Sequence, residues 1–149
     1  MKKHTLLLLV AGLVSLMIAG QVNVGANNNS QVRRVRLQAT SVPFSLIIAA
    51  EGTERVGGAG TDLDPTTEGS FCDIHFNKVT IDEDGHRAVL EGKVVEASDP
   101  VNYGAFVKIT AHTNGNVNFV FQTLPGQPGS TGAAGLDFTG GTVTIVVLQ

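Results

Sequence analysis

Apolar and polar residues alternate along most of the chain after residue 31, and this period of two predicts strands. The clearest region predicts consecutive strands at Phe71–Ile81, His86–Glu96, Ala105–His112 and Val117–Thr123. Further strands are expected at Val32–Thr40, Ser41–Ala50 and Thr142–Leu148, with a short one at Leu136–Phe138. No segment after the N-terminal region keeps a helical period over ten residues. The pattern therefore indicates an all-β fold.

The first hairpin is predicted at Asp84-Gly85, since this dipeptide between alternating runs favours a type I′ turn with positive φ at both central residues. A two-residue loop pairs Ile81 with Ala88 and Val79 with Leu90, which puts all four apolar side chains on one face. Upstream, the apolar positions change from even to odd numbers. A β-bulge near Asn77-Lys78 would restore the facing.

The second hairpin is predicted at Asn114–Asn116. A two-residue loop would mix the faces, whereas a three-residue loop pairs Ala111 with Phe119 and Ile109 with Phe121. Asn116 is expected in the left-handed conformation that Asn tolerates.

Long loops are expected between the remaining strands, at Gly52–Gly69, Ser98–Gly104 and Leu124–Gly135. Short strands separated by turn signals are typical of β-sandwiches and barrels. We expect an antiparallel two-sheet β-sandwich of about 7–8 strands, Ig-like or jelly-roll-like, over residues 32–149.

The N-terminus has the pattern of a secretory signal peptide. Lys2, Lys3 and His4 precede the apolar run Thr5–Ile18, and Val24-Gly25-Ala26 offers small residues for cleavage. Cleavage after Gly20 is the alternative, and an uncleaved membrane anchor is the competing interpretation of the run. We predict a signal peptide at 1–26, a flexible lead-in at 27–31, and a secreted protein, periplasmic or extracellular, without a membrane span after cleavage.

Removing residues 1–26 takes away Lys2 and Lys3, so 8 basic residues face 13 acidic ones, a net charge of −5. An acidic body argues against binding to nucleic acid, which needs clustered Lys and Arg. Arg33, Arg34 and Arg36 lie on a predicted strand and are interpreted as a polar strand edge. The lone Cys72 falls on the apolar phase and is expected to be buried.

One part of the chain resembles secreted bacterial β-sandwich domains of the post-COAP type. The shared features are an A-x-x-x-G-x-V strand (Ala88, Gly92, Val94), an alternating strand with Val107 and Ile109, Asn114-Gly115, and a final Gly-led strand. Thr113 departs from the acidic residue often found before the Asn-Gly of that family. The resemblance implies the secreted address and the sandwich fold, and it transfers no catalytic residue.

No catalytic signature is present. His75, His86 and His112 lack the spacing that places two imidazoles on one zinc ion. Ser70 does not lie in G-x-S-x-G, and Tyr103 is the only Tyr in a chain without Trp, so sugar-binding walls for paired carboxylates are sparse. We therefore predict a protein that is not an enzyme.

Carboxylates in the long loops are the candidate ligands for Ca²⁺, which prefers oxygen donors. The candidates are Asp62, Asp64, Glu68 and Asp99. Strand directions predict that the three long loops share one end of the domain, and we call this expected surface the acidic loop pole. We also assign Glu51, Glu54 and Asp137 to this pole.

These observations favour a secreted or cell-surface, non-catalytic module that binds, adheres or supports structure through the acidic loop pole. Its expected partner is a protein or glycan surface. The alternative is a carrier that holds a small apolar ligand inside a β-barrel or sandwich, and a hydrolase is the third hypothesis.

Overall fold

The computed structural model describes residues 31–41, 46–64, 69–124 and 133–148. The predicted signal peptide and nearly all of the lead-in lie outside them. The strands are β1 (Val32–Thr40), β2 (Ile47–Thr53), β3 (Gly57–Asp64), β4 (Ser70–Ile81), β5 (Arg87–Ala97), β6 (Phe106–His112), β7 (Val117–Gln122), β8 (Ala133–Phe138) and β9 (Thr142–Leu148), with a short 3₁₀ helix η1 (Pro100–Asn102). The all-β prediction is confirmed. No helix in the described part of the chain has the length and apolar character needed to cross a membrane.

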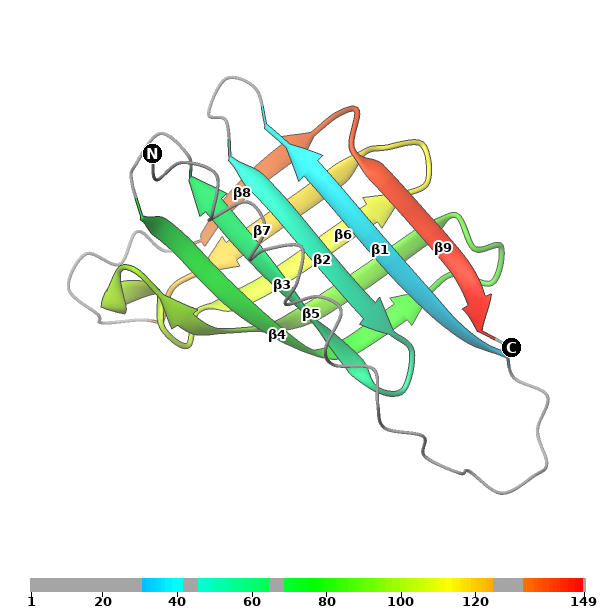
Figure 1. The fold of residues 1–149 in the computed structure, drawn as a ribbon, viewed down its shortest axis with the longest axis horizontal. Helices are drawn as coiled ribbons and strands as arrows, with labels where there is room; N and C mark the ends of the chain where they lie inside the picture. The colour runs from blue at the N-terminus through cyan, green and yellow to red at the C-terminus, as the bar shows by residue number, and fades with distance from the viewer. Residues whose placement is uncertain (1–30, 42–45, 65–68, 125–132, 149) are drawn as a thin grey trace, which may run out of the picture. The chain divides into compact units, whose positions relative to one another are not determined.

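The strands form one antiparallel sheet of nine strands in the order β8-β7-β6-β5-β4-β3-β2-β1-β9 (Figure 1). The prediction of two separate sheets is thus not confirmed. The sheet curls, so that β1, β2 and β9 lie across β6, β7 and β8. The first and last strands, β1 and β9, pair with each other. Pairing between β8 and β9 does not occur among the described residues, which leaves these two strands as the edges of an open sheet.

Strands β4 and β5 bend, and this bending lets a single sheet fold over so that its two halves face each other like the two sheets of a sandwich. These are the longest strands, with 12 and 11 residues, and they run between the two halves. Their pairing shifts register at Asp73/Ile74 and at Phe76/Lys78, and the second shift is the predicted bulge. Gly92 lies at the bend, where an added Cβ would come 2.0 Å from the His75 carbonyl oxygen. Only glycine allows the two backbones to come this close.

The extra strand is β3, which lies inside the predicted loop Gly52–Gly69. The glycines that favoured a loop in the sequence belong to this strand. Gly58 and Gly60 are on the inner face of the sheet, opposite Phe76 and Ile74 of β4. An added Cβ on Gly60 would lie 2.9 Å from Cε2 of Phe76. Glycine therefore makes room for a buried aromatic ring. The preceding strand is also displaced, from the predicted Ser41–Ala50 to β2.

The first hairpin has the predicted pairs Ile81–Ala88 and Val79–Leu90. Its turn differs from the prediction, because Gly85 has positive φ (71°) and Asp84 does not. The Gly85 amide donates to the Asp82 carbonyl at 2.9 Å, and Asp82 pairs with Arg87. The loop therefore spans residues 83–86 and is not a type I′ turn.

The second hairpin has a three-residue loop, but the predicted pairing is wrong. The structure pairs Ile109 with Phe119 and Ala111 with Val117. The loop is 113–115, and Gly115 takes the left-handed position (φ 91°) instead of Asn116. This shift of two residues keeps every side chain on its predicted face, so the hydrophobic pattern alone could not detect it.

The core lies between the facing halves of the sheet. Its largest fully buried side chains come from both halves and include Phe76, Leu90, Ile109 and Phe138. Partly buried residues of the edge strands, among them Leu136, Val143 and Ile145, pack against this core. Cys72 is buried, as predicted.

Candidate functional site

The loop end is defined here as the end of the sheet where β3, β5 and β7 stop and where β4 and β6 begin. An added Cβ on Gly104 would lie 3.3 Å from Cδ1 of Leu124, so the connections after β5 and after β7 meet there. This contact places the first residue of the predicted loop Leu124–Gly135 beside Ser98–Gly104, whereas residues 125–132 of that loop lie outside the described residues. The third predicted loop does not exist as such, because most of Gly52–Gly69 is β3 and the turn before it.

Asp62 is the unusual residue of the loop end. It pairs with Ile48 of β2 and Cys72 of β4, both buried, so its side chain is on the inner face of the sheet. The carboxyl as a whole is partly covered, but Oδ1 is enclosed and has no hydrogen-bond partner. Burial, followed by the charge of Asp64, raises the pKa of Asp62 to about 6. A carboxylate oxygen that lacks a partner in a partly dry site is able to accept a hydrogen bond.

Ser41 is a second inward polar group that lacks a partner. It follows Val35, Leu37 and Ala39 on the inner face, and its amide donates to the Leu46 carbonyl at 2.8 Å. The residue is only 4% exposed, and Oγ has no hydrogen-bond partner. A buried hydroxyl normally has one, because leaving it unpaired costs roughly 1–3 kcal/mol.

Cys72 lies next to Asp62 on the adjacent strand. Burial raises the pKa of its thiol to about 11, and the charge of Asp62 adds to this effect. A hydrogen bond with the side chain of Asn102, in η1, acts in the opposite direction. The free thiol is therefore protonated at neutral pH, which lowers its reactivity as a nucleophile.

The predicted calcium ligands are only partly brought together. Asp62 and Asp64 share the inner face at the end of β3, close enough for their charges to interact. Asp99 caps η1, with Oδ1 accepting from the Val101 amide at 3.0 Å. Glu68 lies outside the described residues. Within the part of the chain that is described, no group of three or more His, Cys, Asp and Glu is arranged for a metal ion, so calcium binding stays a prediction.

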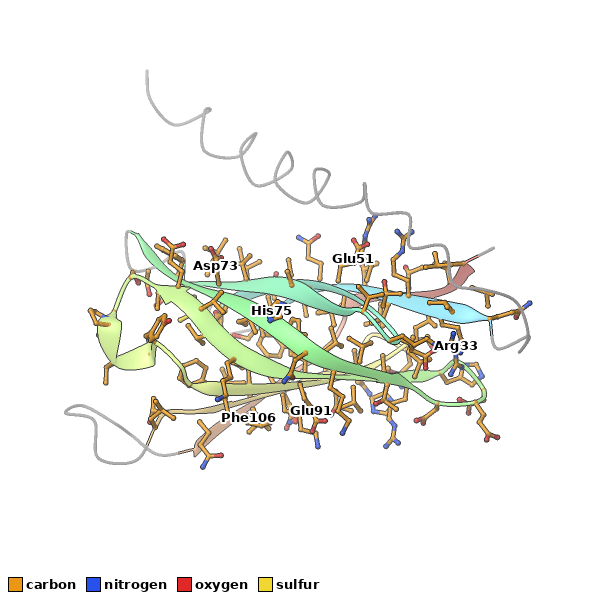
Figure 2. The ribbon with its side chains drawn as sticks, turned by 90° about the horizontal axis from the view of Figure 1, so that it is seen from below. Arg33, Glu51, Asp73, His75, Glu91 and Phe106 are labelled. Carbon is orange, nitrogen blue, oxygen red and sulfur yellow. The ribbon has the colours of Figure 1, made fainter. Side chains whose placement is uncertain are left out.

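Other acidic residues assigned to the acidic loop pole lie elsewhere. Glu51 is on the outer face of β2, with Oε2 2.8 Å from Nη2 of Arg36 (Figure 2). Asp137 is in β8 and accepts a hydrogen bond from Asn118 Nδ2 at 2.7 Å. Glu54 lies in the turn after β2. The acidic loop pole is therefore smaller than predicted, and its inner part consists of Asp62 and Asp64.

The end of the sheet opposite the loop end is called the turn end, and it contains the turns at residues 53–57 and 82–86. Arg33 lies at this end (Figure 2). Its guanidinium forms a two-point ion pair with Glu54, with Nε to Oε2 and Nη2 to Oε1 both at 3.0 Å. It also donates to the carbonyl of Ile81 at 2.6 Å and to that of Asp82. Glu54 Oε1 in turn accepts from the Ile81 amide at 3.1 Å. These satisfied groups tie the start of β1 to the end of β4 and have a structural role.

The interior is tightly packed around Gly52 of β2. An added Cβ on Gly52 would lie 2.6 Å from Cγ2 of Val79 and 3.2 Å from Cδ2 of Leu90. Space that cannot accept a methyl group cannot hold an apolar ligand. This region gives no support to the carrier hypothesis.

The exposed surface of the loop end also carries apolar groups. Tyr103 is 62% exposed directly after η1, and Leu124 is 41% exposed next to Gly104. An exposed aromatic ring near hydrogen-bonding groups is typical of binding surfaces.

Sequence reasoning did not detect the inward orientation of Asp62 or the roles of Ser41 and Asn102. The available signal was the alternation of Asp62, Leu63 and Asp64, which has the period of a strand, but the preceding glycines favoured a loop. Comparison of the chain with protein-family models, curated proteins and solved structures gave no match.

Proposed function

We propose that this protein is a secreted, non-catalytic binding module that holds its ligand at the loop end of the curled sheet. The observation that carries this proposal is the enclosed Oδ1 of Asp62, which has no partner within the described chain. An enclosed carboxylate oxygen without a partner costs folding free energy. Carboxyl groups with a perturbed pKa occur more often at functional sites than at ordinary surface positions. Ser41 Oγ adds a second unpaired group on the same inner face.

The chemistry of these groups favours a ligand that brings hydrogen-bond donors. Sugar hydroxyls donate to a carboxylate and also accept from a serine hydroxyl, and a sugar ring packs well on an exposed aromatic side chain such as Tyr103. A glycan is therefore the favoured partner, and a protein segment that presents a lysine is the second candidate. Secretion follows from the N-terminal pattern, with residues 1–26 as the signal peptide.

The test is a glycan array probed with the fluorescently labelled mature protein at pH 7.5. Asp62→Asn should lower the signal on any bound glycan at least tenfold, and Tyr103→Ala should lower it as well. Asp73→Asn is the matched control, because Asp73 is one strand away and lies on the outside of the sheet (Figure 2). Equal binding by the wild-type protein and Asp62→Asn would contradict the proposed site. A second array with 1 mM Ca²⁺ and with EDTA tests whether calcium takes part.

A further inference from the structure

A second surface combines an open strand edge with an exposed pair of arginines. Strand β9 is the last strand of the sheet, and within the described chain it pairs only with β1. Its sequence, Thr-Val-Thr-Ile-Val-Val-Leu, has no charged residue and no proline. Edge strands usually carry such residues to prevent pairing with another chain, so β9 is an unprotected edge.

The outer face beside this edge is hollowed. Arg34, Arg36, Thr144 and Val146 line a shallow groove of about 250 Å³. The register places Arg36 opposite Thr144 and Arg34 opposite Val146. The side chain of Arg36 is well exposed and that of Arg34 is partly exposed at this groove.

The charge of the groove is positive although the protein as a whole is acidic. Glu51 is the shared partner of both arginines, at 3.3 Å from Arg34 Nη1 and 2.8 Å from Arg36 Nη2. One carboxylate thus faces two guanidiniums, and the side chain of Arg36 remains 61% exposed. An added negative charge would complete the pairing.

We propose that the β9 edge binds an extended acidic peptide segment of a partner protein by strand addition. Backbone groups of the segment would pair with the open edge of β9, as in other cases of strand addition. Side chains of a strand alternate between the two faces of the sheet. Acidic residues two positions apart in the added strand would therefore lie on the outer face, in register with Arg34 and Arg36. Apolar residues between them contact the inner side of the edge, where Val147 is 46% exposed.

The other edge of the sheet does not offer this combination. Asp137 pairs with Asn118 on the outer side of β8, and it would repel an acidic segment. An acidic segment should therefore bind at β9 and not at β8, so β8 serves as an internal control.

The probe is the labelled peptide acetyl-Thr-Glu-Val-Glu-Val-Glu-Thr-amide, measured by fluorescence anisotropy at 50 mM salt. We expect it to bind at least tenfold more tightly than the same peptide with Lys in place of Glu. N-methylation of alternate backbone amides, which removes hydrogen-bond donors and keeps the charge, should weaken binding about tenfold or more. Arg36→Gln should weaken it about two- to fivefold. Lys93→Gln, which removes an exposed positive charge from β5, should leave it unchanged.

Hydrogen exchange locates the peptide. Addition of the acidic peptide should protect alternate amides of β9 and leave those of β8 unaffected. The proposal is overturned if the N-methylated peptide binds equally well, if inorganic phosphate binds as tightly as the peptide, or if the protected amides belong to β8. It is also overturned if no binding occurs at millimolar peptide, or if β9 amides of the free protein are already protected in a dimer.

Discussion

Replacement of Asp62 by asparagine should make the protein more stable at neutral pH but not at low pH. The pKa of this carboxyl is raised from 3.8 to about 6 in the folded chain. Each pKa unit corresponds to about 1.4 kcal/mol, so ionisation of the folded protein costs at most about 3 kcal/mol. Because the carboxyl is not fully buried, solvent reduces this cost, and we expect about 1–2 kcal/mol.

The sign follows from proton binding. Below about pH 3 the carboxyl is largely protonated in the folded and unfolded chains, so it contributes no pH dependence there. Between about pH 4 and pH 6 the folded chain binds more protons, so the free energy of unfolding contributed by this group falls as pH rises. Above pH 6 the full cost is present. The side-chain amide of the Asp62→Asn variant is neutral throughout, and therefore the stability difference between variant and wild type should grow between pH 4 and pH 6 and then stay constant.

The assay is urea unfolding followed by circular dichroism at pH 4.0, 5.0, 6.0 and 7.5. The slope with urea should be unchanged, so that differences in midpoint report stability. Asp73→Asn controls for the loss of one negative charge on the neighbouring strand. A constant difference between Asp62→Asn and wild type from pH 4.0 to pH 7.5 would refute the reasoning, since it would mean that the carboxyl is not held in a dry environment.

Three further predictions concern the fold. Glu54→Gln removes the charged partner of a largely buried guanidinium and should cost about 1–3 kcal/mol in urea unfolding, whereas Glu91→Gln, in an exposed Lys–Glu–Lys row, should cost less than about 1 kcal/mol. Gly92→Ala should cost more than about 2 kcal/mol, because its Cβ would meet a backbone oxygen at 2.0 Å, whereas Gly135→Ala, with nothing within 4 Å, should stay within about 0.5 kcal/mol. Cys72 should react with a thiol reagent only after denaturant is added, and rapid labelling of the native protein would show that the thiol is accessible.

The alternation of apolar and polar residues was sufficient to predict the all-β fold class. It also predicted, for most strands, which side chains lie on the inner face. The boundaries of β1 and β9 match the prediction because their β-branched residues alternate without interruption. Strand β3 was missed because its inner positions hold glycine and aspartate. Gly60 makes room for the ring of Phe76 on β4, and Gly58 for the backbone of β2, and neither reason is visible in the local sequence. The continuity of all nine strands in one curled sheet also could not be read from the sequence, since bending at Gly92 depends on its close approach to the carbonyl of His75 on another strand.

The candidate site was predictable only in part. The spacing of Asp62 and Asp64 identified the relevant carboxylates, but the orientation of Asp62 depends on the pairing of β3 with β2 and β4. Local sequence carries no signal for that pairing. Ser41 and Asn102 enter the same end of the molecule through tertiary structure alone.

The proposed site depends on the Asp62 carboxyl, whose enclosed Oδ1 has no hydrogen-bond partner among the described residues and is therefore proposed to be available to a ligand. The most direct measurement is an NMR titration of its side-chain ¹³C signal from pH 3 to pH 9, assigned by comparison with Asp62→Asn. A midpoint near 6 is expected. A midpoint at or below 3.8, the usual value for Asp, would show that the carboxyl is solvated or already paired, and it would contradict the proposed site.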